Sequence, residues 1–145
     1  MLNEIIAAFV GALFFSILFN IDRDSLKYGG FAGAYSWFCY KVGLYYTNNS
    51  VMAVFLAAVL VAVLSELAAR KLKKPVTIFM IPGIVTLVPG ALAYFTMFHF
   101  VRGDYTSGLA TGAETMFSAG AIAAGIALVS ILFRSGKPRV GGRFD

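Results

Sequence analysis

Charged residues divide this chain into five long, mainly apolar runs, and this spacing limits the folds that the chain can adopt. The first run lies between Glu4 and Asp22, and the others cover residues 28–46, 51–69, 76–100 and 109–133. About 20 apolar residues in a helix cross the hydrocarbon core of a bilayer. The chain is 59% hydrophobic and 13% charged, whereas soluble domains are about 45–50% apolar and about 25% charged. We therefore expect an all-α membrane protein, with five transmembrane helices in one domain over residues 1–133.

Lysine and arginine gather in alternate connections, which predicts the orientation of the helices. Ten of the twelve cations follow the first, third or fifth run: Arg23, Lys27, Arg70, Lys71, Lys73, Lys74, Arg134, Lys137, Arg139 and Arg143. Cytoplasmic loops carry the excess of Lys and Arg in membrane proteins. We therefore place the N-terminus outside and the C-terminus in the cytoplasm, and expect residues 134–145 to form a basic, disordered cytoplasmic tail. The net charge of +5 is then a signal of topology and not of nucleic-acid binding.

The fourth run carries two helix breakers in its middle. It contains "IPGIVTLVPG" at residues 81–90, with Pro82-Gly83 and Pro89-Gly90 seven residues apart. Proline removes a backbone donor and glycine weakens a helix interior. Irregular backbone at membrane depth must be buried in protein or line a polar cavity. The alternatives are a proline-kinked continuous helix and a functional break, and we favour the break.

A break at Pro89 would begin a second half-helix near the middle of the membrane, because proline suits the first turn of a helix. Its free N–H groups and positive dipole end would attract a carboxylate. Discontinuous helices form substrate sites of this kind in many secondary transporters. We predict that six residues of this run bind the substrate: Pro82, Gly83, Thr86, Pro89, Gly90 and Tyr94.

Three charged residues fall within the predicted runs: Lys41, Glu66 and Glu114. Glu66 precedes Arg70 by four residues at the basic end, so we expect it to form a surface ion pair. Lys41 and Glu114 each lie about five residues below the outer end of their run, so we place them at similar depth, where they could pair or hold the two ends of a zwitterion. Charges inside transmembrane segments are functional hypotheses by default. We predict that Lys41 binds substrate and that Glu114 couples transport to protons. The alternative for Lys41 is snorkelling to the outer headgroups, with Trp37 and Tyr45 as packing partners.

The residues that most often carry enzyme chemistry are scarce. The chain has one cysteine, Cys39, and one histidine, His99. A single cysteine excludes an internal disulfide and a cysteine metal cluster. We find no nucleophile and base at a suitable spacing, and expect no cofactor, no bound metal and no enzymatic activity.

The segment "KKPVTIFMIPGIVTLVPGALAY" resembles the threonine/serine exporter (ThrE-like) family, whose members carry an "IPG…PG…Y" core after a basic loop. The small-residue segment "AGAIAAGIAL" and the length also fit, and the likeness covers essentially the whole chain. It is greatest to the stand-alone small subunit, the YjjB-like branch (the ThrE_2 domain). The resemblance implies a multi-pass protein of the bacterial plasma membrane. Its expected substrates are small amino acids such as threonine and serine, or a small dicarboxylate such as succinate.

The resemblance also implies a partner. In fused members a cytoplasmic, hydrolase-like region and a first membrane half precede a half like this one, so we expect a separate, larger YjjP-like (ThrE_1-type) membrane subunit with a cytoplasmic domain. Two five-span halves could be related by an inverted pseudo-two-fold axis, with the site between them. We therefore expect a secondary-transporter subunit in contact with membrane lipids and not with nucleic acid. The alternative is a non-transporting scaffold or assembly subunit for a larger partner.

Overall fold

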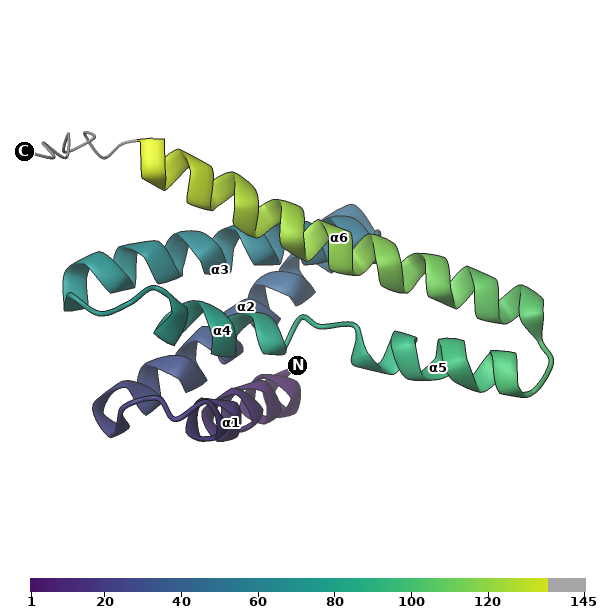
Figure 1. Ribbon diagram of the computed structural model, residues 1–145, viewed down its shortest axis with the longest axis horizontal. Coiled ribbons are helices and arrows are strands. Elements are labelled where there is room, and N and C mark those ends of the chain that lie inside the picture. Colours follow the sequence, from purple (N-terminus) through teal and green to yellow (C-terminus); the bar gives the residue numbers. More distant parts are fainter. Residues whose placement is uncertain (136–145) are drawn as a thin grey trace, which may run out of the picture.

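The computed structural model describes residues 1–135 of the chain, and these residues form six α-helices (Figure 1). In chain order they are α1 (Leu2–Leu18), α2 (Arg23–Thr47), α3 (Ser50–Leu72), α4 (Thr77–Val85), α5 (Gly90–Val101) and α6 (Tyr105–Ser135). The described part of the chain contains no strand. The prediction of an all-α protein is therefore confirmed.

Two of these helices, α3 and α6, are each long and apolar enough to cross a membrane. The pair α4 and α5 passes the same test together, with a bend of 44° between the two helices, which raises the possible number of crossings to three within the described residues. The first helix is apolar but has only 17 residues, and α2 is longer but less apolar. Five crossings and their orientation therefore stay predictions.

The helices extend beyond the apolar runs that indicated them. The second run begins at residue 28, yet α2 begins at Arg23, because Arg and Lys form helix about as readily as Leu and an acidic residue, Asp24, suits the first turn of a helix. At the other end of the chain α6 continues through Arg134 and Ser135, so the first two residues of the expected tail are helical. The remainder of that tail, residues 136–145, lies outside the described residues.

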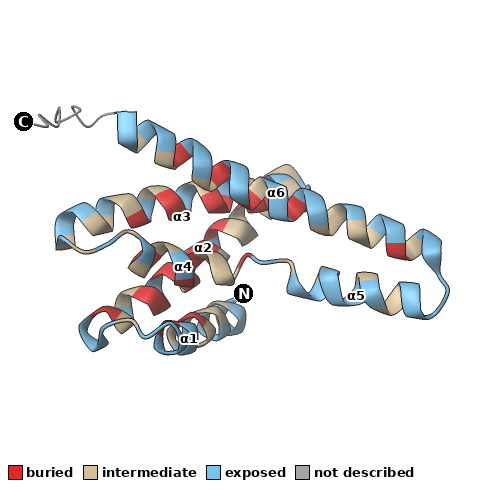
Figure 2. Ribbon diagram, in the orientation of Figure 1, coloured by how far each residue is buried: buried red, intermediate tan, exposed pale blue. Residues whose placement is uncertain are grey.

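The second helix lies at the centre of the fold and packs against α1, α3 and α4. Buried residues concentrate in α2, α3 and α4, as Figure 2 shows. Glycines permit the closest approach: a Cβ atom at Gly33 would overlap that of Ala12 and lie 3.2 Å from Cγ2 of Thr86. Small residues let helix backbones approach closely where lipid supplies no hydrophobic drive for association. Gly33 therefore sets how closely α2 approaches α1 and the C-terminal end of α4.

The basic segments gather at one end of the molecule. Figure 1 shows the α1–α2 connection, the α3–α4 connection and the C-terminal end of α6 at the same end. Lys74 Nζ donates to Ser25 Oγ at 2.6 Å and lies 3.8 Å from Asp22 Oδ2, which joins the first two of these segments. Arg70 Nη2 donates to the Phe133 carbonyl at 3.2 Å, which joins α3 to α6.

The fifth helix projects away from the other helices as an arm with the first half of α6 (Figure 1). It contains no buried residue, and its main packing partner is α6. The two helices meet through small residues: a Cβ atom at Gly108 would lie 3.1 Å from the Phe100 ring, and one at Gly112 would lie 3.2 Å from Thr96. The arm therefore presents most of its apolar surface outward.

Candidate functional site

The chain leaves helical geometry between α4 and α5, at residues 86–89. Tight turns follow the end of α4, since the N–H of Leu87 donates to the Ile84 carbonyl at 2.8 Å and the N–H of Val88 donates to the Val85 carbonyl at 3.4 Å. Pro89 then occupies the N-cap position of α5, and Gly90 is the first helical residue. The second Pro-Gly pair thus stands at the junction of the two helices.

The first Pro-Gly pair does not interrupt a helix, so of the two helix breakers in this run only the second stands at a break. Pro82 lies inside α4 and is fully buried. A Cβ atom at Gly83 would lie 3.0 Å from Cγ2 of Val61 and 3.5 Å from Cβ of Ala32. The helix is short, and its packing against α2 and α3 outweighs the one backbone hydrogen bond that the proline removes. Pro82 and Gly83 therefore belong to the packing beneath the break.

A cavity of about 210 Å³ adjoins the break. Its lining comes from α2, α3, the break itself, the start of α5, and α6: Trp37, Tyr40, Ser50, Val54, Thr86, Leu87, Val88, Pro89, Gly90, Ala91, Leu92 and Ser118. Within the described residues no side chain caps the N-terminus of α5. The N–H of Gly90 donates to the Val88 carbonyl at 2.8 Å. The first N–H groups of a helix have no intrahelical partner, so Ala91 and Leu92, which line the cavity, supply the backbone donors of this helix end.

A second cavity, of about 360 Å³, lies on the α1 side of the break. Its lining residues are Glu4, Ala7, Ala8, Gly11, Phe15, Trp37, Val85 and Thr86. Trp37 and Thr86 line both cavities. These two side chains therefore form the wall that separates them.

The hydroxyl of Thr86 fastens the break to α2. Its Oγ1 lies 2.9 Å from Ser36 Oγ and 3.0 Å from the Gly83 carbonyl. A hydroxyl has one hydrogen, so we assign the donation to the carbonyl to Thr86 and the donation between the hydroxyls to Ser36. Ser36 is fully buried. Thr86 is the acceptor that satisfies this buried hydroxyl.

Lys41 pairs with Glu4 and not with Glu114. Its Nζ lies 2.9 Å from Glu4 Oε2, and the indole Nε1 of Trp37 donates to the same oxygen at 3.3 Å. The contact of Lys41 with Trp37, which belonged to the snorkelling alternative, is present, with Nζ 5.5 Å from the ring centroid. The sequence did not indicate Glu4 as the partner of Lys41, because the two residues lie on different helices. Glu4 served only to mark the start of the first apolar run.

Glu114 reaches the first cavity through another residue. Its Oε1 accepts a hydrogen bond from Ser50 Oγ at 2.8 Å, and Ser50 lines the cavity, as does Ser118 one turn after Glu114.

Tyr94, which was predicted to bind substrate, does not line either cavity. It is 64% exposed and lies against Phe95 and Phe98 of its own helix. Of the eight predicted site residues, Thr86, Pro89 and Gly90 line the cavity at the break.

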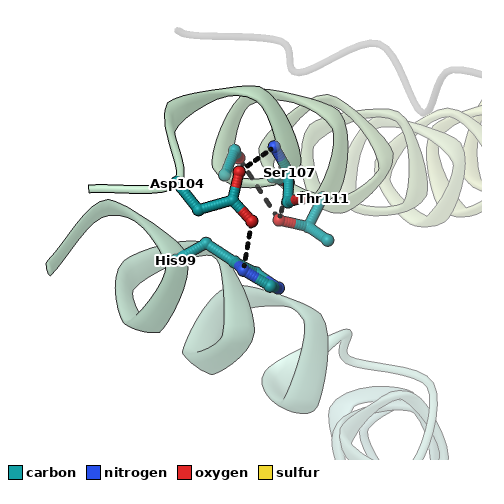
Figure 3. Close-up of polar contacts among 5 residues, drawn as sticks. His99, Asp104, Ser107 and Thr111 are labelled. Carbon is teal, nitrogen blue, oxygen red and sulfur yellow. Dashed lines mark hydrogen bonds and ion pairs between the residues drawn. The ribbon is translucent and has the colours of Figure 1, made fainter. Parts of the chain in front are cut away.

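The α5–α6 turn holds a further polar cluster (Figure 3). Nδ1 of His99 lies 3.4 Å from Oδ2 of Asp104, while Oδ1 of Asp104 accepts the backbone N–H of Ser107 at 3.1 Å. These hydrogen bonds from Ser107, with a smaller effect of His99, hold the pKa of Asp104 below its usual value. Arg102 lies over the Phe98 ring, at 4.3 Å from its centroid. The cluster caps α6 and is remote from both cavities.

The described residues include no group of three or more His, Cys, Asp or Glu side chains that could hold a metal ion. The polar groups at the break are backbone N–H groups, hydroxyls and one indirectly connected carboxylate. Such groups can bind a small anion or zwitterion by hydrogen bonds.

Comparison with known proteins finds a matching family profile and, among curated proteins, a weakly similar relative. A family profile described as "Threonine/Serine exporter, ThrE" matches residues 4–132. An uncharacterized protein of Haemophilus influenzae is 29% identical over 149 aligned positions, which cover 97% of this chain and 50% of that protein. The chain therefore spans about half the length of this curated relative. No solved structure matches the chain.

Proposed function

The chain belongs to the threonine/serine exporter family, a family of transporters and not of enzymes, and from this premise we propose that it is the membrane subunit of a secondary transporter. With its apolar helices it is a multi-pass protein of the bacterial inner membrane. The proposed substrates are threonine and serine, or a small dicarboxylate such as succinate. The proposed direction of transport is out of the cell.

The observation that carries this proposal is the cavity at the uncapped N-terminus of α5. The substrate carboxylate accepts hydrogen bonds from the first turn of α5, where the helix dipole favours a negative charge. Ser50, Thr86 and Ser118 line the same cavity, and the hydroxyls of Ser50 and Ser118 bind the polar groups at the other end of the substrate. Its volume of about 210 Å³ is below the range of roughly 300–1,000 Å³ found for drug-sized ligands, which favours a small substrate.

Glu114 is the proposed proton-coupling residue. As a carboxylate it accepts the hydrogen bond from Ser50, and this fixes the direction of the Ser50 hydroxyl in the cavity wall. A protonated Glu114 could donate to Ser50 instead, which would free the Ser50 hydrogen for the substrate. The proton on Glu114 and the substrate in the cavity are coupled in this way.

The proposed exporter has two membrane parts. We assign this chain five crossings, with the N-terminus outside, the basic end in the cytoplasm, and α4 with α5 as one broken crossing. The second part is a larger YjjP-like subunit with a cytoplasmic domain, and membrane lipids surround both. The greater length of the H. influenzae relative, of which this chain spans half, supports an exporter with two parts.

A double substitution at the break tests the proposal. Pro89→Ala with Gly90→Ala supplies the missing donor and favours one continuous helix. A Cβ atom at Gly90 meets no atom within 4 Å, so a steric clash would not explain a loss of function. In cells that co-express the larger subunit, we expect efflux of the carried substrate to fall by roughly tenfold, the equivalent of about 1.4 kcal/mol.

Gly120→Ala is the matched control, because Gly120 lies in α6 and its Cβ would also meet no atom within 4 Å. Unchanged efflux by the double variant, at equal protein amounts, would contradict the assigned site.

The alternative is a non-transporting scaffold that stabilises a larger partner. The tight glycine contacts at Gly33 and Gly125 show how strongly small residues govern packing in this chain. The scaffold is favoured if Lys41→Ala and Glu114→Gln both leave efflux unchanged while changes to small-residue faces abolish complex formation.

A further inference from the structure

We propose that Lys41 and Trp37 form a second carboxylate subsite, and that the side chain of Glu4 occupies this subsite in the structure. The proposal rests on the export of a carboxylate-bearing substrate and adds a binding step on the α1 side of the break.

The donors of this subsite converge on one point. Lys41 Nζ and Trp37 Nε1 lie 2.9 Å and 3.3 Å from the same atom, Oε2 of Glu4. Their side chains are neighbours on one face of α2, since residues four apart in a helix lie one above the other. A cation and a neutral N–H that share one carboxylate oxygen make a charge-assisted arrangement. The pair is therefore a carboxylate site that already contains a carboxylate.

The carboxylate of Glu4 is replaceable. Its side chain is 44% exposed and that of Lys41 is 28% exposed, and ion pairs of such exposure contribute little to stability. Glu4 and Trp37 also line the cavity of about 360 Å³, so a small molecule in that cavity meets one of the two donors, Trp37, and the carboxylate that both donors hold. A substrate carboxylate can take the place of Glu4 without leaving the lysine unpaired.

The subsite lies in series with the cavity at the break. Trp37 lines both cavities, and its ring packs against that of Tyr40 at 5.2 Å. When a substrate carboxylate displaces Glu4, the indole exchanges its internal acceptor for one on the substrate. The substrate is then held at the wall between the two cavities, next to Thr86.

The chain contains a single tryptophan, so its fluorescence reports on this subsite directly. The purified full chain in lipid nanodiscs is titrated with L-threonine, L-serine and succinate, and L-threonine amide serves as the probe without a carboxylate. We expect a saturable change in Trp37 emission with at least one carboxylate and none with the amide. Glu4→Gln removes the internal competitor, and we expect the apparent Kd to fall by about fivefold. Glu66→Gln, which removes the same charge from α3, is the matched control and should leave the Kd unchanged.

Lysine variants supply the opposite test. Lys41→Gln should raise the apparent Kd by roughly tenfold or more, and Lys41→Arg, which keeps the charge, should restore most of the affinity. Equal affinities for the wild type and Glu4→Gln, or for the wild type and Lys41→Gln, would overturn the subsite. No response to any carboxylate in the wild type and in Glu4→Gln would also overturn it.

The double variant Pro89→Ala with Gly90→Ala separates this proposal from the proposed function. Its Trp37 response should persist, because the subsite lies on the α1 side of the break, and loss of the response in this variant alone would assign the signal to the break. Persistent binding together with no export by the reconstituted complex would overturn the proposed function and leave the subsite standing.

Discussion

Thr86 is the residue on which the geometry of the break most depends. Its hydroxyl satisfies the buried hydroxyl of Ser36 and binds the Gly83 carbonyl. Thr86→Val keeps the shape but leaves Ser36 without this acceptor, and an unsatisfied buried polar group costs about 1–3 kcal/mol. We expect the free energy of unfolding to fall by about 1–2 kcal/mol and efflux to fall with it, measured by denaturation in detergent and by export assays.

Thr96→Val is the matched control for this prediction. The Thr96 hydroxyl bonds only to the Leu92 carbonyl of its own helix, at 2.8 Å, so its loss leaves no other side chain without a partner. Equal stability and equal efflux for the two variants would contradict the role assigned to Thr86.

Asp104 makes a pH-dependent contribution to stability. Its pKa in the folded protein lies below the ordinary value of 3.8, chiefly because of the hydrogen bonds from Ser107. The contribution is therefore fully present above pH 3.8 and is lost as the pH falls through the lower, folded-state pKa. We expect the unfolding temperature of the wild type to lose its advantage over Asp104→Asn between about pH 4 and about pH 2. A constant difference across that range would contradict this assignment.

At the scale of single residues, the sequence predicted which types of residue matter better than which residues meet. The position of Lys41 inside a run and its contact with Trp37 could be read from helical spacing, because both residues lie on one helix. Its partner Glu4 lies on another helix. A pairing between helices depends on how they pack and rotate, which the spacing of residues within one helix does not contain.

The contact between α1 and α2 depends on glycine. A methyl group at Gly33 would overlap Cβ of Ala12 and lie 3.0 Å from the backbone oxygen of Ala8. Overpacking of this kind costs about 1–3 kcal/mol, because a backbone cannot move aside as a flexible side chain can. We expect Gly33→Ala to lower the free energy of unfolding by that amount, measured by denaturant titration.

Gly11→Ala on the neighbouring helix is the control for Gly33→Ala. Its Cβ would meet no atom within 4 Å, and alanine is favoured over glycine in a helix by about 1 kcal/mol. We expect this control to be neutral or stabilising, and a similar loss in both variants would point to a general effect of helix propensity.

The two Pro-Gly pairs show what local sequence can and cannot predict about the helices. Both have the same composition, yet Pro89-Gly90 stands at the start of α5 whereas Pro82-Gly83 lies within α4. The difference comes from neighbours: Pro82 and Gly83 are covered by α2 and α3, while Gly90 faces open space. Local propensity indicates where a helix can break, and packing decides where it does.

At the scale of the whole molecule, the basic segments of the described residues lie at one end (Figure 1). The residues Lys74, Ser25 and Asp22 join two basic connections, and Arg70 joins a third segment through Phe133. The positions of the cations in the sequence indicated that these segments lie at the same end of the molecule, although the contacts that join the segments could not be predicted.

The number of crossings depends instead on helix length. Helix α6, with 31 residues, is about 46 Å long, well beyond the roughly 30 Å of a hydrocarbon core. Such a helix must tilt or extend beyond the lipid.

Single cysteines test the orientation of the assembled protein. In a Cys39→Ala background, which removes the only native thiol, Lys71→Cys marks the basic end and Thr106→Cys marks the α5–α6 turn, and both positions are exposed. Because Lys and Arg are retained on the cytoplasmic side, a membrane-impermeant maleimide should label position 106 in intact cells and position 71 only after permeabilisation. The remaining cations of the basic end keep the charge bias, so the substitution at 71 should not itself invert the protein.

Labelling of position 71 from outside would show that the orientation is the reverse of the predicted one. In the predicted orientation the subsite formed by Lys41 and Trp37 lies toward the outer surface, where it would release the exported substrate. In the reverse orientation it would lie toward the cytoplasm, where it would receive the substrate first.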